Sequence, residues 1–250
     1  MFTGLIKTQG TIRRVDQRGD CMVTIAMAEP FAVDIGDSIS CNGICLTAVK
    51  VNDNEFKVSL SAETMNRTTA RDWAVGSVIN LEPSLSVGDA MGGHFVSGHV
   101  DGLARIVAAE KSGDSTIWEF EVPPHLARFI APKGSVTLDG VSLTVNEVRD
   151  RAMNCSSPLA GEATRLSERS ELSRSGEGAM TRGSINVTAP SPNPLPQGER
   201  ASLSTTFTAN IIPHTAKVTN FGRLKVGESV NLEIDMLARY VARLTEKKMA

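Results

Sequence analysis

The sequence has few cysteines, few aromatic residues and no long hydrophobic run, and each shortage excludes a class of protein. Among its 250 residues there are four cysteines, and aromatic residues make up 4%. Four scattered cysteines cannot form the dense disulfide framework of a small secreted domain. No apolar run reaches the ~18 residues of a membrane span, and the opening MFTGLIKTQG is too short and polar for a secretory signal. We therefore expect a cytoplasmic protein with no membrane partner.

Charge and metal-ligand spacing exclude two further classes. The 26 Lys and Arg and the 28 Asp and Glu residues are interleaved, which leaves a formal net charge of -2. Because nucleic-acid-binding proteins concentrate basic residues against phosphates, nucleic acid is not an expected partner. Cys41 and Cys45 lie close in sequence, but no second Cys or His pair at ligand spacing accompanies them, so no metal site is expected.

The most informative feature that is present is an internal repeat. Residues 36–51, GDSISCNGICLTAVKV, align without a gap to residues 133–148, KGSVTLDGVSLTVNEV. The match extends upstream, where 3–15 resembles 97–107, and downstream, where VGSVINLE resembles VGESVNLE. Each copy therefore carries the same short segments in the same order, which predicts two small domains of one kind.

The repeated segments have the pattern of short strands. They alternate apolar and polar residues, favour Val, Ile and Thr, and are separated by Gly, Asp and Asn. Six short antiparallel strands are most economically closed into a barrel, because closure removes exposed strand edges. We predict an all-β fold of two tandem six-stranded Greek-key barrels, the first over 1–93 and the second over 94–234.

The second copy is interrupted at the position of a hairpin turn. Four residues separate Val51 from Phe56 in the first copy, whereas 58 separate Val148 from Phe207 in the second. Residues 149–206 lack aromatic residues and are rich in Ser, Gly, Pro, Arg and Glu, which is typical of low-complexity sequence. We interpret them as an insert at a hairpin tip, where extra residues are tolerated. A partner-binding or lid segment is the alternative.

The last residues, 235–250, predict a helix. Their apolar positions recur at helical spacing, and Asp235 is suited to be the N-cap. A small closed barrel offers no groove wide enough for such a stripe, so we expect this helix to mediate oligomerisation. The apolar positions are Met236, Leu237, Tyr240, Val241 and Leu244.

Several motifs occur in the order found in one enzyme family. They are MFTG at the start, NGICLT and DGVSLTV in the repeat, MGGHFVSGHVDG at 91–102 and VNLEID at 230–235. Outside 149–206 the chain resembles the riboflavin synthase family, trimeric transferases built from two lumazine-binding barrels. The resemblance implies a cytoplasmic homotrimer that needs no cofactor. It also implies the reaction, in which two molecules of 6,7-dimethyl-8-ribityllumazine exchange a four-carbon unit to give riboflavin and 5-amino-6-ribitylamino-pyrimidinedione.

The repeat gives an independent reason for this chemistry. A chain that repeats one binding unit can hold two copies of one ligand in related poses, as a reaction between two identical molecules requires. Alignment of bound reactants can remove roughly 7 kcal/mol of a barrier. The lumazine C7 methyl is already acidic because its carbanion spreads into the ring, so hydrogen-bond donors and a modest proton relay suffice.

The family pattern implies one substrate site in each copy. The first is implied to contact Gly4, Leu5, Ile6, Cys45, Leu46, Thr47, Ser59, Leu60, Ser61, Ala62, Glu63 and Thr64. The second is implied to contact Gly98, His99, Val100, Lys133, Ser142, Leu143, Thr144, Asn210, Ile211, Ile212, Pro213, His214 and Thr215.

Five of the family-matched residues are implied to be catalytic: Cys45, His99, Ser142, Thr144 and Asp235. Cys45, or a water that it positions, could add to C7 of one lumazine. Ser142 and Thr144, with His99 close by, could relay the methyl proton of the other. The first-copy counterpart of Asp235 is Ser84, and this difference suggests that one pocket is the donor and the other the acceptor.

Two of these assignments have a structural alternative, and a further histidine has two interpretations. Cys45 could be a small buried side chain, and Asp235 could act only as a helix cap. His94, near the domain junction, is as compatible with a structural hydrogen bond as with a site.

Two other function classes remain open. A non-catalytic lumazine- or flavin-binding protein of the same fold would be expected to have lost the second pocket, yet Lys133, Ser142, Thr144 and Asp235 are all present. A flavin-binding reductase barrel should be followed by a glycine-rich nucleotide-binding unit, and no G-x-G-x-x-G follows a strand here. The sequence therefore favours the enzyme.

Overall fold

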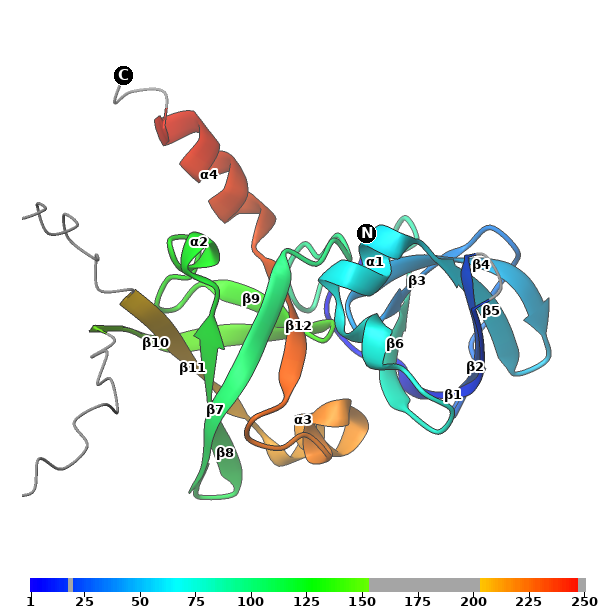
Figure 1. Ribbon diagram of the computed structural model, residues 1–250, viewed down its shortest axis with the longest axis horizontal. Coiled ribbons are helices and arrows are strands. Elements are labelled where there is room, and N and C mark those ends of the chain that lie inside the picture. The colour runs from blue at the N-terminus through cyan, green and yellow to red at the C-terminus, as the bar shows by residue number, and fades with distance from the viewer. Residues whose placement is uncertain (18–19, 153–202, 247–250) are drawn as a thin grey trace, which may run out of the picture. The chain divides into compact units, whose positions relative to one another are not determined.

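The computed structural model describes residues 1–17, 20–152 and 203–246, and these form two closed antiparallel barrels of six strands each, followed by a helix (Figure 1). The predicted fold class is confirmed. The two barrels have the same cyclic strand order: β1-β2-β5-β4-β3-β6 in barrel 1 corresponds to β7-β8-β11-β10-β9-β12 in barrel 2. The repeat in sequence is thus a repeat in topology.

Barrel 1 runs from Thr8 to Pro83. Its strands are β1 (Thr8–Asp16), β2 (Cys21–Met27), β3 (Ser38–Cys41), β4 (Ile44–Asn52), β5 (Glu55–Leu60) and β6 (Val78–Pro83). Helix α1 (Ala62–Arg67) and the 3-10 helix η1 (Thr69–Asp72) lie between β5 and β6.

Barrel 2 runs from Gly102 to Ile234. Its strands are β7 (Gly102–Ser112), β8 (Ser115–Val122), β9 (Ser135–Leu138), β10 (Val141–Ala152), β11 (Leu203–Ile211) and β12 (Ser229–Ile234). Its helical turns are α2 (Pro124–Ala127), α3 (Pro213–Val218) and η2 (Asn220–Gly222), and α4 (Met236–Glu246) follows the barrel.

Alternation of apolar residues places one face of every strand inside its barrel. In β2, Cys21, Val23, Ile25 and Met27 are buried while the residues between them are half-exposed, as a period of two requires. The second interior holds an aromatic cluster, in which the rings of Phe120 and Phe207 lie 5.3 Å apart. Each barrel therefore has its own core.

The turns Asn42-Gly43 and Asp139-Gly140 join the two barrels. Both residues of each turn have positive φ, 49° and 78° in the first and 45° and 82° in the second, as in type I′ hairpins. The turns approach so closely that a Cβ on Gly43 would lie 2.7 Å from the Gly140 nitrogen. Only glycine fits there, which explains why each copy has Gly at this position.

The β10–β11 hairpin is longer than its counterpart. In barrel 1 the last pair is Asn52 with Glu55 around the predicted turn, whereas in barrel 2 pairing continues to Ala152 with Leu203. The ends of the predicted insert, 149–152 and 203–206, therefore belong to strands, because the antiparallel pairing continues past the point where the sequence similarity stops. Residues 153–202 lie outside the described residues.

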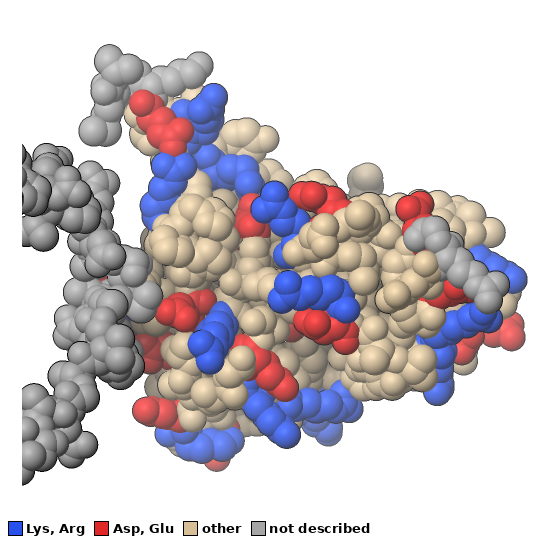
Figure 2. Space-filling model, viewed as in Figure 1, with Lys and Arg blue, Asp and Glu red and all other residues tan. Residues whose placement is uncertain are grey.

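Helix α4 begins as predicted. The Asp235 carboxylate accepts a hydrogen bond from the Leu237 N–H at 2.8 Å, so its assignment as N-cap is confirmed. Leu237, Tyr240 and Val241 are exposed, and in Figure 1 the helix extends away from the end of β12. Within the described ranges, no helix is long and apolar enough to cross a membrane. On the face shown in Figure 2, acidic and basic side chains are interspersed.

Candidate active site

The first four residues of strand β4 and of strand β10 place equivalent side chains on the same two faces of their barrels. Leu46 and Leu143 point into the cores, with 5% and 9% of their surface exposed. Cys45 and Ser142 are half-buried on the opposite face. This face continues to the exposed Thr47 and Thr144. The chemistry predicted for this motif therefore lies on the outer face of each barrel.

Each of these faces is completed by a segment from the other copy. We name residues 1–7 the first crossing segment and residues 96–101 the second. The Cys45 N–H donates to the Gly98 carbonyl at 2.8 Å, and the Ser142 N–H donates to the Gly4 carbonyl at 2.9 Å. The sequence-based grouping, which assigned 4–6 to the first site and 98–100 to the second, is therefore wrong for these segments.

Two further contacts show that the first crossing segment docks on barrel 2 and the second on barrel 1. Ile6 packs against the core of barrel 2, and Val100 packs against the core of barrel 1. The crossing segments also pair with each other, because Phe2 and Val96 form an antiparallel bridge. Gly4 and Gly98 both have a φ of 77°, and a Cβ on either would lie within 2.6 Å of the Cβ of Ser142 or Cys45, respectively. The crossing thus requires glycine at both points.

The Cys45 face of barrel 1 encloses a hollow of about 320 Å³, here called the Cys45 hollow. Helix α1 forms part of its wall, and the Ser61 hydroxyl fixes the start of this helix by accepting from the Thr64 N–H at 3.1 Å. Arg67, which the motifs did not single out, pairs with Glu63 at 3.0 Å. The lining residues are Ile44, Cys45, Glu63, Thr64, Arg67, Thr68, Gly98, His99, Val100 and Asp101.

The equivalent face of barrel 2 carries a hydrogen-bonded group, here called the Ser142 cluster. The Ser142 hydroxyl lies 2.7 Å from Nδ1 of His94, and Nε2 of the same ring lies 3.1 Å from the Thr137 hydroxyl. Burial lowers the pKa of His94, while the charge of Asp235 raises it in part. The ring is therefore neutral near pH 7, and in this form it can accept a proton.

The histidine beside Ser142 differs from the expected one. The sequence predicts His99 close to Ser142 and Thr144, whereas His99 lines the Cys45 hollow because the second crossing segment runs to barrel 1. His94 bonds Ser142 instead. The signal available in the sequence was the motif MGGHFVSGHVDG, which contains both histidines, but spacing alone does not assign them to barrels.

Other residues named from the family pattern lie at the rims or inside the cores. Leu60 and Ile211 are 1% and 2% exposed, so only their backbone can meet a ligand outside the barrel. The remainder are half-buried or exposed: Leu5, Ser59, Ala62, Asn210, Ile212, Pro213, His214 and Thr215.

Lys133 has a strained backbone. Its φ is 67°, its side chain is exposed, and its N–H donates to the Val145 carbonyl at 2.7 Å. The first-copy counterpart is Gly36, with a φ of 101°. A non-glycine residue in this region costs about 1 to 3 kcal/mol, which is compatible with a role for the lysine side chain.

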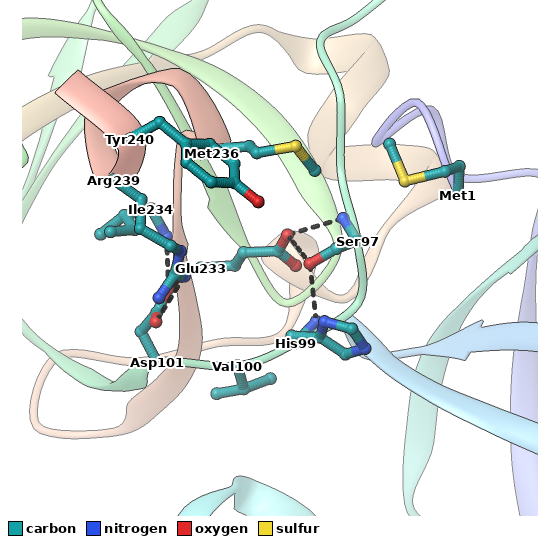
Figure 3. Close-up of a pocket in the computed structure, with 10 residues that line it drawn as sticks. All are labelled: Met1, Ser97, His99, Val100, Asp101, Glu233, Ile234, Met236, Arg239 and Tyr240. Carbon is teal, nitrogen blue, oxygen red and sulfur yellow. Dashed lines mark hydrogen bonds and ion pairs between the residues drawn. The ribbon is translucent and has the colours of Figure 1, made fainter. Parts of the chain in front are cut away.

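A larger hollow of about 530 Å³ borders the second crossing segment (Figure 3). Glu233 projects toward Ser97 in this view, and the Arg239–Asp101 ion pair, at 2.7 Å, ties α4 to the same segment. Among the described residues, no three His, Cys, Asp or Glu side chains gather as metal ligands.

Comparison with known proteins gives a consistent result. The family model "Lumazine binding domain" matches residues 3–84, 97–174 and 186–235. The chain is 36% identical to riboflavin synthase of Brucella abortus over 253 residues, covering 98% of each, and 34% identical to that of Photobacterium phosphoreum, covering 98% of this chain and 88% of the relative. It is 30% identical to riboflavin synthase of Bacillus subtilis, covering 99% of this chain and 91% of the relative.

Solved structures show the same fold. LumP complexed with 6,7-dimethyl-8-(1'-D-ribityl) lumazine superposes with a TM-score of 0.62 at 19% identity, covering 94% of this chain and 99% of that one. LumP complexed with riboflavin gives a TM-score of 0.64 at 19% identity. At this identity the likeness concerns the fold alone.

Proposed function

The chain belongs to the riboflavin synthase family of lumazine-binding enzymes, and from this membership we propose how its two barrels divide the reaction. Two molecules of 6,7-dimethyl-8-ribityllumazine exchange a four-carbon unit to give riboflavin and 5-amino-6-ribitylamino-pyrimidinedione. One lumazine binds at the Cys45 hollow and the other at the Ser142 cluster.

The observation that carries this proposal is the paired environment of Cys45 and Ser142. Each N–H donates to a glycine carbonyl of a crossing segment, at 2.8 and 2.9 Å. The backbone around Cys45 therefore has the same arrangement as the backbone around Ser142, which suits the binding of two identical ligands. The side chains at these two positions differ, which suits a reaction in which one molecule donates carbon and the other accepts it.

The Ser142 cluster is suited to remove the methyl proton. Neutral His94 lies within hydrogen-bond distance of the Ser142 hydroxyl, and this pair can pass the C7-methyl proton to the imidazole. The charge of Asp235 then stabilises the imidazolium. Cys45, or a water that it holds, adds to C7 of the second lumazine, which becomes the acceptor.

The assay is turnover of the lumazine by the purified protein with nothing else added. We expect riboflavin and the pyrimidinedione to form one to one. A protein that binds the lumazine without producing riboflavin would be a carrier of the same fold, and an absolute need for a nicotinamide or a metal ion would contradict the cofactor-free reaction.

We further propose a homotrimer held by α4 and acting in the cytoplasm. The support is the exposed apolar stripe of the helix and the trimeric organisation that the family resemblance implies. The stripe consists of Leu237, Tyr240, Val241 and Leu244.

A further inference from the structure

Two glutamates outside the proposed machinery hold the crossing segments. Glu82, in β6, and Glu233, in β12, occupy equivalent positions and are 5% and 4% exposed. A buried carboxylate is costly unless it is hydrogen-bonded. Both side chains point to a crossing segment, and both use the same pattern of bonds.

The bonds of Glu82 fix the first crossing segment. Its Oε1 accepts from the N–H and the hydroxyl of Thr3, both at 2.7 Å, and its Oε2 accepts from the Gly4 N–H at 3.0 Å. The Thr3 hydroxyl in turn accepts from the Leu5 N–H at 3.2 Å. Three successive backbone N–H groups are therefore oriented by one carboxylate.

The bonds of Glu233 repeat this arrangement on the second crossing segment (Figure 3). Its Oε1 accepts from the N–H and hydroxyl of Ser97 at 2.6 and 2.7 Å, and its Oε2 accepts from the Gly98 N–H at 2.9 Å. The Ser97 hydroxyl accepts from the His99 N–H at 3.3 Å. Burial raises the pKa of both carboxyls, and these hydrogen bonds lower it in part.

The carbonyls of the two held glycines are the groups that bond the reactive strands. Glu82 holds Gly4, whose carbonyl accepts from Ser142 in barrel 2. Glu233 holds Gly98, whose carbonyl accepts from Cys45 in barrel 1. Each glutamate thus stands in one barrel and constrains the candidate site of the other.

We propose that Glu82 and Glu233 are positioning residues for the reaction and that they act crosswise, Glu82 on the Ser142 cluster and Glu233 on the Cys45 hollow. The kinetic part of this inference rests on the function proposed above; the crosswise geometry does not. The consequence is that the two sites are mechanically tied within one chain, so that neither barrel presents its site independently of the other.

The test uses Glu82→Gln and Glu233→Gln in the full chain. Glutamine keeps the shape but places an NH₂ group where one carboxylate oxygen accepts a backbone N–H, so one bond to each segment is lost. Chains labelled with ¹⁵N-cysteine or ¹⁵N-serine report the amides of Cys45 and Ser142. We expect Glu233→Gln to shift the Cys45 amide and leave Ser142 in place, and Glu82→Gln to do the reverse.

Kinetics separate positioning from folding. A displacement of about 1 Å at a reacting group can lower a rate about a hundredfold, so both variants should lose kcat to that order while KM changes less. Each variant is the control for the other. A second control is Glu119→Gln, which alters a carboxylate of β8 that accepts from Thr206 of β11 at 2.6 Å and bonds neither glycine of the crossing segments, so it should move neither amide nor kcat.

Several outcomes would overturn the proposal. They are a shift confined to the amide of the same barrel, equal shifts at both amides in both variants, and full kcat in either variant. If a glutamine variant does not fold, Ser97→Ala and Thr3→Ala remove one bond to each carboxylate and must show the same crosswise pattern. If the unaltered chain makes no riboflavin while the amide shifts are crosswise, the proposed function fails and the geometric inference stands.

Discussion

At the scale of single residues, the two copies differ where their backbones agree. Cys45 and Ser142 make the same bond to a crossing segment, yet one carries a thiol and the other a hydroxyl beside His94. Gly36 and Lys133 share a left-handed conformation that is free of strain only in the first. The side chains differ on a shared backbone geometry, and the predictions at this scale concern His94 and Lys133.

Replacement of His94 by Gln should change the pH dependence of turnover. Burial lowers the pKa of His94 below its ordinary value of 6.5, so the native chain keeps a neutral base below that pH and loses turnover only as pH falls further. His94→Gln should lower kcat about a hundredfold and remove this acid limb. The measurement is kcat across pH, and an acid limb that persists in the variant would assign it to another group.

The same substitution has a stability signature. Because the native state favours the neutral ring, the unfolded state binds more protons between the lowered native pKa and 6.5, and the free energy of unfolding falls as pH decreases through that window. Urea unfolding on both sides of the window should show a smaller decrease in His94→Gln than in the native chain.

Replacement of Lys133 by Gly should separate stability from activity. Glycine relieves a left-handed strain of about 1 to 3 kcal/mol and loses roughly 0.5 to 1 kcal/mol of backbone entropy, so the free energy of unfolding should rise by about 1 kcal/mol. Turnover should fall if the lysine contacts substrate. Denaturant titration and kinetics of Lys133→Gly and of a Lys133→Ala control test this. A lower free energy of unfolding in Lys133→Gly than in the native chain would show that the backbone at Lys133 is not strained.

At the scale of elements, the internal repeat does not predict the length of the β10–β11 hairpin or the presence of helix α4. The β10–β11 hairpin continues three pairs beyond the point that corresponds to Asn52 and Glu55, and it ends with Ala152 directly opposite Leu203. Two strand ends in register can be joined by a two-residue turn. The helix α4, in turn, has no counterpart after barrel 1.

Joining Ala152 to Leu203 by Asn-Gly should leave turnover unchanged. The turn would replace residues 153–202, and shortening a loop of this length should stabilise the barrel by roughly 3 kcal/mol through loop-closure entropy. Thermal unfolding and the lumazine assay are the measurements. Loss of turnover with an intact barrel would assign the removed residues a catalytic or gating role.

Deletion of residues 236–250 should dissociate the oligomer. Each buried apolar side chain contributes about 1.5 to 3 kcal/mol, so removal of the α4 stripe should abolish association at micromolar concentration. The barrels should still fold, because their cores contain no residue of α4. Sedimentation of the truncated chain at the mass of the intact assembly would show that the stripe packs elsewhere.

At the scale of the whole molecule, the question is where the two lumazines meet. The crossing segments complete the Cys45 hollow and the Ser142 cluster within one chain, and the reaction also requires the two bound ligands to face each other. We expect them to do so between barrel 1 of one subunit and barrel 2 of a neighbour. The Asn42–Gly43 and Asp139–Gly140 turns hold the barrels of one chain together at a different place.

Mixing two defective chains tests this expectation. Cys45→Ala chains retain the Ser142 cluster, and Ser142→Ala chains retain the Cys45 hollow. If neighbouring subunits share a site, random reassembly of equal amounts restores about one quarter of the sites, since one pairing in four joins two intact halves. Each mutant alone is the control. Activity that stays at the level of the separate mutants would place the complete site within one chain.

The sequence alone determined the repeat, the barrels and the helix, because these follow from local patterns. Alternation of apolar residues predicts strands such as β2, the four residues between Val51 and Phe56 predict a hairpin turn, and Asp235 before an apolar stripe predicts a capped helix. The repeat pairs the residues at the start of β4 with those at the start of β10, and the family resemblance implies their role in the site.

Only the tertiary structure decided which segments complete each site. The segments around Gly4 and Gly98 resemble each other in sequence, and an alignment of the two copies pairs each segment with its own copy. Their exchange depends on contacts between residues far apart in the chain: the Phe2–Val96 bridge and the carboxylates of Glu82 and Glu233. The second crossing segment carries His99 to the Cys45 hollow. His94 lies before that segment and is held at barrel 2 instead, because its N–H donates to the Thr3 carbonyl of the first crossing segment at 3.2 Å and its ring bonds Ser142.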